Sequence, residues 1–530
     1  MTSMTNDVRA TDRLSRDALT VLQPGFEGTT APDWLLRQIA DGLAAVGLFG
    51  RNITTPEQLT ALTAQLRAER DDLLVAIDEE SGDVTRLEVV DGSSFPGNYA
   101  LGTVDDTALT RDVAHELGRR LAACGVDFNW APSADVNANP DNPVIGVRSF
   151  GADAALTARH TVAYLQGLQD AGVAACVKHF PGHGDTNVDS HHAMPRIDVG
   201  LETLHARDLL PFREAIAAGT KAVMSAHILL PALDPDRPAT LSPRILTGLL
   251  REELGFDGLI VTDGMEMQAI AATYGIERGS VLALAAGADA ICVGGGLADE
   301  GTVLALRDAI VTAVREGDLP EERLADAAAR VRALADWTRR ARGAVAAPGA
   351  ETQEGTAPGV RGGAANGVVR DLSDIGLVAA RRAVQVTPGA EPYRPVTEPA
   401  YVAAFAPEAN IAVGDETPWG VAGELAALLP GTVSVTRTDV PVEEAAGLAG
   451  EVLAEAGDRR IVAVVRDAHR HDWMAAALDA LVTARPDTVV VEMGLNGAEP
   501  KGALYIATHG AARVCGRAAA EVITGASAGV

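Results

Sequence analysis

Residues 178–192 read KHFPGHGDTNVDSHH, and they follow directly on an apolar run at residues 172–177. The apolar run predicts a short buried strand, and the Gly, Pro, Asp and Asn residues after it indicate a loop. In α/β folds, loops at the carboxyl ends of buried strands carry much of the chemistry. We therefore expect this loop, rich in Lys, His and Asp, to belong to a functional site.

The alternation of apolar runs and helical stretches continues on both sides of this loop. Further candidate strands lie at 73–77, 126–132, 221–227, 258–263 and 288–294. Strands separated by helices predict parallel β/α units, and their number in residues 1–345 suits a (β/α)8 barrel of the TIM type. The alternative is an open doubly wound sheet, but Gly294-Gly295-Gly296 has the wrong spacing for a dinucleotide-binding loop.

A second domain is expected after the barrel. Residues 346–370 are rich in Pro, Gly and Ala and lack periodicity, which is typical of a linker. Residues 371–530 return to α/β patterning, with candidate strands at 410–414, 460–465 and 488–493. We predict a smaller α/β sandwich domain there.

The composition limits the partners expected for this chain. With 530 residues and a net charge of −28, it is expected to bind neither nucleic acid nor an anionic membrane surface. Residues 1–19 lack the pattern of a secretory signal, and no apolar run approaches the length of a membrane span. The 4 cysteines are widely scattered, which favours reduced core residues and a cytoplasmic location over a disulfide framework.

Asp263 is the first candidate for catalysis. It follows four apolar or small residues of the run at 258–263, so its carboxylate is expected at a strand end, partly desolvated and reachable from one side. Such a carboxylate suits nucleophilic attack on an electrophilic carbon. The alternative is that Asp263 caps the helix that follows, and spacing alone does not separate the two.

Asp189 and His191 form the second candidate, because residues two apart on an extended segment point to the same side. A carboxylate on one ring nitrogen leaves the other nitrogen to give or take a proton near neutral pH. One alternative is a solvated histidine. Another is a metal site, but the spacing of the loop matches no known ligand pattern, so neither a metal nor another cofactor is expected.

These stretches resemble the bacterial family 3 glycoside hydrolases that act as β-N-acetylglucosaminidases, in particular the peptidoglycan-recycling type. The resemblance covers roughly residues 35–340, and residues after 379 resemble the second α/β domain of some members. The motifs that carry it are Lys178–Thr186 with Asp189-Ser190-His191, Ile77–Gly82, Asn142–Gly151, Val223–His227 and Val261–Met267. Glu79 and Ser81 depart from it, because many relatives have Gln and Gly at these positions.

The resemblance implies a retaining mechanism in which Asp263 is the nucleophile and His191, paired with Asp189, is the acid/base. It also implies the residues that hold the sugar: Asp78, Arg148, Lys178, His179 and His227. The implied reaction releases terminal N-acetylglucosamine from cell-wall or chitin fragments. Phosphate in place of water as acceptor would make the protein a phosphorylase, and a sugar-binding protein on the same barrel is the non-enzymatic alternative.

Overall fold

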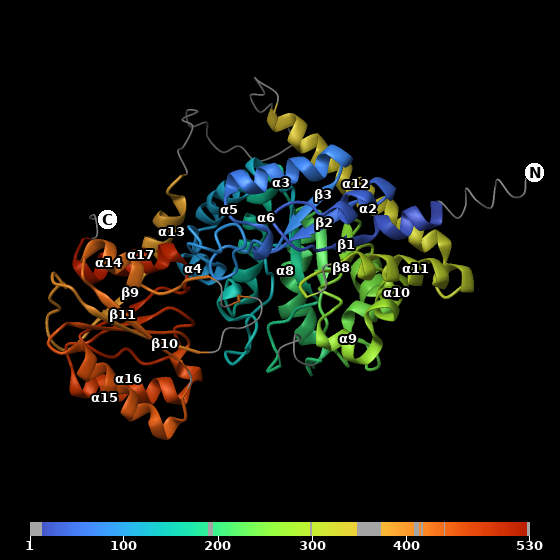
Figure 1. The fold of residues 1–530 in the computed structure, drawn as a ribbon. Helices are drawn as coiled ribbons and strands as arrows, with labels where there is room; N and C mark the ends of the chain where they lie inside the picture. Colours follow the sequence, from blue (N-terminus) through green and yellow to red (C-terminus); the bar gives the residue numbers. More distant parts are fainter. Residues whose placement is uncertain are drawn as a thin grey trace, which may run out of the picture.

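The chain forms a barrel of strands and helices followed by a smaller layered α/β body (Figure 1). The computed structural model describes residues 13–188, 194–296, 299–346, 373–407, 413–414, 417–438 and 440–526. The linker predicted at 346–370 lies almost wholly outside these ranges. The division into domains at 1–345 and 371–530 therefore stays a prediction.

Eight parallel strands of the described residues make the barrel. Their bounds are β1 (Leu22–Pro24), β2 (Ala45–Leu48), β3 (Leu74–Ile77), β4 (Phe128–Asn129), β5 (Ala174–Phe180), β6 (Ala222–Ser225), β7 (Leu259–Val261) and β8 (Ile291–Val293). Strands β2 to β7 pair in sequence order, and β1 pairs with β8. A parallel bridge from Val261 to Ala290 connects β7 to the start of β8, and β1 lies beside β2, so the order closes on itself.

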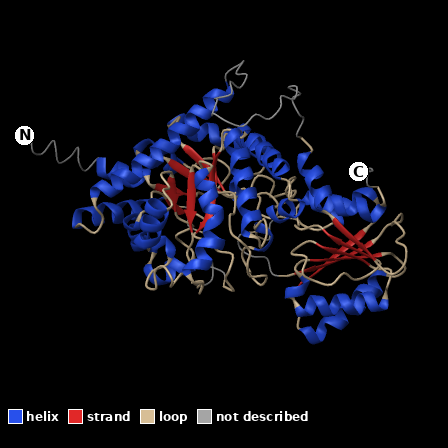
Figure 2. Ribbon diagram, turned by 180° about the vertical axis from the view of Figure 1, so that it is seen from behind, coloured by secondary structure: helices blue, strands red, loops and turns tan. Residues whose placement is uncertain are grey.

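Helices surround the barrel strands, as Figure 2 shows. The longer ones are α2 (Asp33–Asp41), α3 (Pro56–Glu69), α4 (Asn98–Val104), α5 (Thr107–Ala123), α6 (Ala154–Asp170), α8 (Leu209–Ala217), α9 (Gln268–Tyr274), α10 (Ile276–Ala286), α11 (Glu300–Glu316) and α12 (Glu321–Ala346), with π-helical turns η3 (Leu204–Asp208) and η5 (Arg244–Glu253). Side-chain oxygens of Asp106 and Asp153 cap α5 and α6 by accepting from their first amides. No helix in the described ranges is long and apolar enough to cross a membrane.

The second body is a six-stranded sheet between two layers of helices (Figures 1 and 2). Its strand order is β11-β10-β12-β13-β14-β9, and β9 alone runs antiparallel to its neighbour. The strands are β9 (Gln385–Pro388), β10 (Tyr401–Ala406), β11 (Val433–Thr438), β12 (Ile461–Val465), β13 (Val489–Glu492) and β14 (Leu504–Ala507). The helices are α13 (Ile375–Ala383), α14 (Ala422–Leu428), α15 (Ala445–Ala456), α16 (Asp472–Ala484) and α17 (Arg513–Thr524).

The expected fold class, a TIM-type barrel followed by an α/β sandwich, is confirmed, but one expected strand is wrong. Residues 413–414 of the strand predicted at 410–414 lie in a turn and an irregular segment, and 410–412 lie outside the described residues. The strand of this region is β10, whose Tyr401–Ala406 backbone pairs with both β11 and β12. The sequence signal at 410–414 was a short apolar run without alternation, which does not distinguish strands from loops.

Candidate active site

A cavity of about 670 Å³ opens at the carboxyl ends of the barrel strands. In β5, Ala174 and Cys176 belong to the inner cluster of the barrel, while Ala175 and Val177 belong to the cluster that packs against the helices. Lys178 continues the inward series, because side chains alternate between the two faces of a strand. Asp78 after β3 and Asp263 after β7 have the same place in their strands, so three strands deliver polar side chains to one cavity.

Of the eight predicted site residues, five line this cavity: Asp78, Arg148, Lys178, His179 and Asp263. Asp189 and His191 lie outside the described residues. His227 is fully buried and is not among the lining residues. The cavity thus brings together predicted site residues that are up to 185 positions apart in the sequence, from Asp78 to Asp263.

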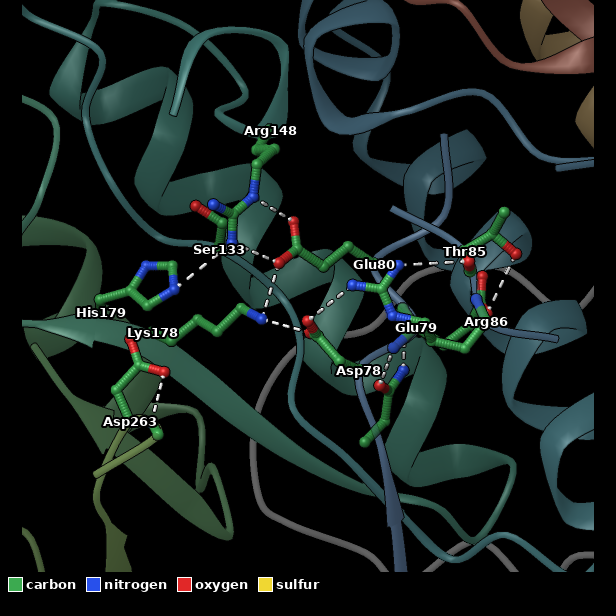
Figure 3. Close-up of polar contacts among 12 residues, drawn as sticks. Asp78, Glu79, Glu80, Thr85, Arg86, Ser133, Arg148, Lys178, His179 and Asp263 are labelled. Carbon is green, nitrogen blue, oxygen red and sulfur yellow. Dashed lines mark hydrogen bonds and ion pairs between the residues drawn. The ribbon is translucent and has the colours of Figure 1, made fainter. Parts of the chain in front are cut away.

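Asp263 stands at the tip of β7 with its carboxylate toward the cavity (Figure 3). The amide of Gly264 donates to its Oδ1 at 2.8 Å. His227 supports the same turn from behind, because its Nε2 lies 3.0 Å from the carbonyl oxygen of Gly264 and its Nδ1 lies 2.9 Å from Oγ1 of Thr240. Helix α9 begins only at Gln268, so the alternative in which Asp263 caps that helix is wrong.

Glu80 is the centre of a buried ion network that the sequence alone did not single out. Arg148 donates to it with two nitrogens, Nη2 to Oε1 at 2.7 Å and Nε to Oε2 at 3.0 Å, and Nζ of Lys178 lies 2.6 Å from Oε1 (Figure 3). Burial by itself would raise the pKa of Glu80, but the charges of Arg148 and Lys178 outweigh it and hold the pKa well below its usual range. The three side chains therefore stay charged and fix one another's positions.

Lys178 also contacts Asp78, with Nζ 2.5 Å from Oδ1. Burial lowers the pKa of Lys178, while the carboxylates of Asp78 and Glu80 raise it, and the net effect is a raised value. Arg86, which sequence reasoning missed, lines the cavity next to Asp78, with 3.8 Å between Nη2 and Oδ2. This array of donors and acceptors is suited to the hydroxyl groups of a sugar.

Glu79 orders the chain segment that carries Arg86. Its Oε2 accepts hydrogen bonds from the amides of Arg86 at 2.7 Å and Leu87 at 2.8 Å and from the hydroxyl of Thr85 at 3.1 Å. Burial raises the pKa of Glu79 to about 7, although these donors oppose the shift. The segment is therefore held by a buried carboxyl group, because Glu79 is only 1% exposed.

His179 is oriented by Asp135, whose Oδ2 lies 2.7 Å from its Nδ1. Asp135 also accepts from the amides of His179 and His183, so one carboxylate organises the start of the loop. The other ring nitrogen, Nε2, lies 3.4 Å from Nη2 of Arg148, which can only donate. The proton of the neutral ring is therefore assigned to Nδ1, and Nε2 accepts.

Residues 189–193, which include the predicted acid/base, lie outside the described residues, and the loop is fixed on both sides of them. Nδ2 of Asn139 donates to the carbonyl oxygen of Thr186 at 3.2 Å, and Nη2 of Arg207 lies 2.8 Å from Oδ2 of Asp185. On the far side, the amide of Leu229 donates to the carbonyl oxygen of Pro195 at 2.9 Å. Within the described ranges, no group of three or more His, Cys, Asp or Glu side chains has the arrangement of a metal site.

The second body reaches the same cavity. Val413 and Gly414, which follow β10, are among the residues that line it. Nη2 of Arg470 donates to the carbonyl oxygen of Asp141 in the barrel at 3.2 Å, whereas Trp473 is buried within the second body against Phe405. The stretch after β12 is thus in part a contact with the barrel.

Comparison with protein families adds a match for residues 24–334, to the model described as the glycosyl hydrolase family 3 N-terminal domain. Among solved structures, a glycoside hydrolase family 3 β-N-acetylglucosaminidase from Paenibacillus sp. str. FPU-7 is 35% identical and superposes with a TM-score of 0.80, covering 96% of each chain. Both bodies therefore have a counterpart in a single known fold.

Curated relatives match the barrel part. The chain is 38% identical over 264 residues to a protein named β-hexosaminidase A from Pseudoalteromonas piscicida, which corresponds to 46% of this chain and 44% of that protein. It is 39% identical over 259 residues to a β-hexosaminidase from Chromobacterium violaceum, which corresponds to 47% of this chain and 71% of that protein. The match thus spans less than half the length of the first of these relatives.

Proposed function

The chain belongs to glycosyl hydrolase family 3, and from this premise we propose that it is a retaining exo-β-N-acetylglucosaminidase. Its substrates are fragments of cell wall or chitin that end in N-acetylglucosamine, and it acts in the cytoplasm. The observation that carries the proposal is the position of Asp263 at the tip of β7, in the cavity that Asp78, Arg148 and Lys178 also line. Glu80 holds Arg148 and Lys178 from behind this lining.

In the first step, a carboxylate oxygen of Asp263 attacks the anomeric carbon and forms a glycosyl ester. The bond to the leaving oxygen breaks, and His191 gives that oxygen its proton. In the second step, His191 takes a proton from water, the water oxygen attacks the same carbon, and the ester breaks to return the Asp263 carboxylate. Two displacements on one carbon retain its configuration. Asp189 holds the imidazole in its working tautomer.

Binding of the terminal sugar is assigned to the charged cluster beside the nucleophile. Asp78 and Arg86 face the cavity and supply an acceptor and donors. Lys178 and Arg148 are fixed by Glu80, so their donors are already oriented before the sugar arrives. Preorganised donors of this kind lower the cost of ordering the site on binding. His227 acts from behind, on the turn after Asp263.

The test is hydrolysis of a chromogenic aryl β-N-acetylglucosaminide by the purified chain and by the variant D263A. We expect turnover by the wild type and a loss of at least about a thousandfold in the variant, because the covalent route is removed. Retention of N-acetylglucosamine binding by D263A serves as the control for folding. Absence of turnover on every aryl glycoside, with sugar binding intact, would instead favour a sugar-binding protein.

Phosphorolysis is the second candidate. Two further guanidinium groups, those of Arg51 and Arg86, line the cavity, and an imidazole acid/base does not repel an anionic acceptor as a carboxylate does. Product analysis with and without inorganic phosphate separates the two reactions. Free N-acetylglucosamine in both conditions supports hydrolysis, and N-acetylglucosamine 1-phosphate formed only with phosphate supports phosphorolysis.

A further inference from the structure

The loop between β3 and α4 contacts both the binding cavity and the second body. On one side this loop carries Arg86 and Val89, which line the cavity. On the other side it contacts the second body. Nε of Arg513 donates to the carbonyl oxygen of Gly92 at 3.4 Å, and the amide of Val514 donates to the carbonyl oxygen of Ser93 at 3.4 Å.

Asp83 makes the strongest of these contacts. Its Oδ2 accepts from Nη2 of Arg466, which directly follows β12, and its Oδ1 accepts from the amide of Ala511 at 2.7 Å. The side chain of Asp83 is 2% exposed and that of Arg466 is 17% exposed. A buried carboxylate that loses its cationic partner is strongly destabilised, so this pair couples the loop to the second body.

Asp83 lies within the tight turn that presents the sugar-binding residues. The amide of Glu80 donates to the carbonyl oxygen of Val84 at 3.1 Å, which closes the turn around Asp83. Ser81 has a φ of 70° and Gly82 a φ of 65°. The left-handed region is unfavourable for a residue with a Cβ such as Ser, so the turn needs support from outside.

We propose that the second body positions the sugar-binding turn through the ion pair between Asp83 and Arg466. Asp83 and Arg466 are positioning residues, because neither lines the cavity. The proposal rests on the proposed function for its substrate. Asp78 precedes the turn, Glu80 begins it and Arg86 follows it, so an unanchored turn leaves all three less ordered. The affinity for the sugar falls in proportion as the turn spends a smaller fraction of time in its competent conformation.

The experiment compares R466A with R382A. Each variant removes an arginine of the second body that pairs with a barrel aspartate. Arg466 pairs with Asp83, and Nη1 of Arg382 lies 2.8 Å from Oδ2 of Asp106 at the start of α5. Only the Arg466 pair lies on the sugar-binding turn. For R466A we expect the KM for an aryl β-N-acetylglucosaminide to rise about tenfold, with kcat changed less than about threefold, since a turn that is competent a tenth of the time costs tenfold in affinity. R382A is expected to match the wild type.

A second readout does not depend on turnover. Hydrogen exchange at the amides of Arg86 and Leu87, which donate to Glu79, is expected to accelerate at least about tenfold in R466A and to stay unchanged in R382A. R466K keeps the charge and is expected to recover part of the affinity. Should R466A fail to fold, D83N tests the same pair from the barrel side.

Equal KM and equal exchange for R466A and the wild type would overturn the proposal, and so would equal effects of R466A and R382A. If the wild type shows no turnover, the proposed function fails, while the exchange comparison still decides whether the second body anchors the turn.

Discussion

Replacement of Glu79 by Gln tests the electrostatics of the site through stability. Glu79 is buried, and its pKa is raised from 4.5 to about 7, first by burial and then by the charge of Glu88. Between these two values the folded protein binds more protons at this group than the unfolded chain does. The free energy of unfolding therefore falls as the pH rises, and the contribution of the neutral acid is lost above pH 7.

The magnitude follows from the size of the shift. Between pH 5.5 and pH 8, the group is expected to lower the free energy of unfolding by about 2 kcal/mol, because each unit of pKa difference corresponds to 1.36 kcal/mol. E79Q cannot ionise, and its amide oxygen can accept from the amides of Arg86 and Leu87 as Oε2 does now. Relative to the wild type, E79Q should therefore gain about 2 kcal/mol over this interval.

Urea unfolding at several pH values between 5.5 and 8, followed by tryptophan fluorescence and circular dichroism, measures this difference. E57Q is the matched control, because it makes the same substitution at an exposed position of α3. We expect the gain of about 2 kcal/mol between pH 5.5 and pH 8 for E79Q and not for E57Q. A difference between E79Q and the wild type that stays constant with pH would refute the reasoning for Glu79.

Three further outcomes follow from the arrangement of the site. E80A leaves the buried cations of Lys178 and Arg148 without their shared carboxylate. The free energy of unfolding should therefore fall by about 3–5 kcal/mol, measured by a thermal or urea melt. An unchanged melt would contradict the role of Glu80. H191A should lower kcat/KM for a substrate with a poor leaving group, such as a disaccharide, by at least about a hundredfold more than kcat/KM for an activated nitrophenyl glycoside. Equal losses of kcat/KM for the two substrates would argue against the acid role. Dialysis against a chelator should leave activity unchanged, because the proposed steps use only side chains of the chain, and a loss restored by a divalent cation would revive the metal alternative.

The barrel and three of its polar side chains could be predicted from local patterns. Alternation in a strand fixes which residues face inward, so Asp78, Lys178 and Asp263 follow from the apolar residues before them. The strands that were missed in the second body include its two edges. Burial of β11 alternates only weakly and β9 is exposed throughout. Neither strand therefore contains the apolar run by which buried strands are recognised in a sequence.

The side chains that contact the site residues could not be predicted from local sequence patterns. Glu80 meets Arg148 across 68 positions, and Asp83 meets Arg466 across 383. Nothing in the spacing of charges along the chain selects these pairs, because the approach is decided by how the loops after β3 and β12 fold. The same limit applies to Arg86, whose place beside Asp78 depends on a turn with two left-handed residues.

The central claim is that Asp263 is the nucleophile that captures the sugar. Incubation with an activated, fluorinated β-N-acetylglucosaminide that slows release of the intermediate, followed by proteolysis and mass spectrometry, identifies the side chain that becomes glycosylated. We predict a labelled peptide with the sugar on Asp263, and no label in D263A. A sugar found on another side chain, or rapid turnover of the probe by D263A, would contradict the account.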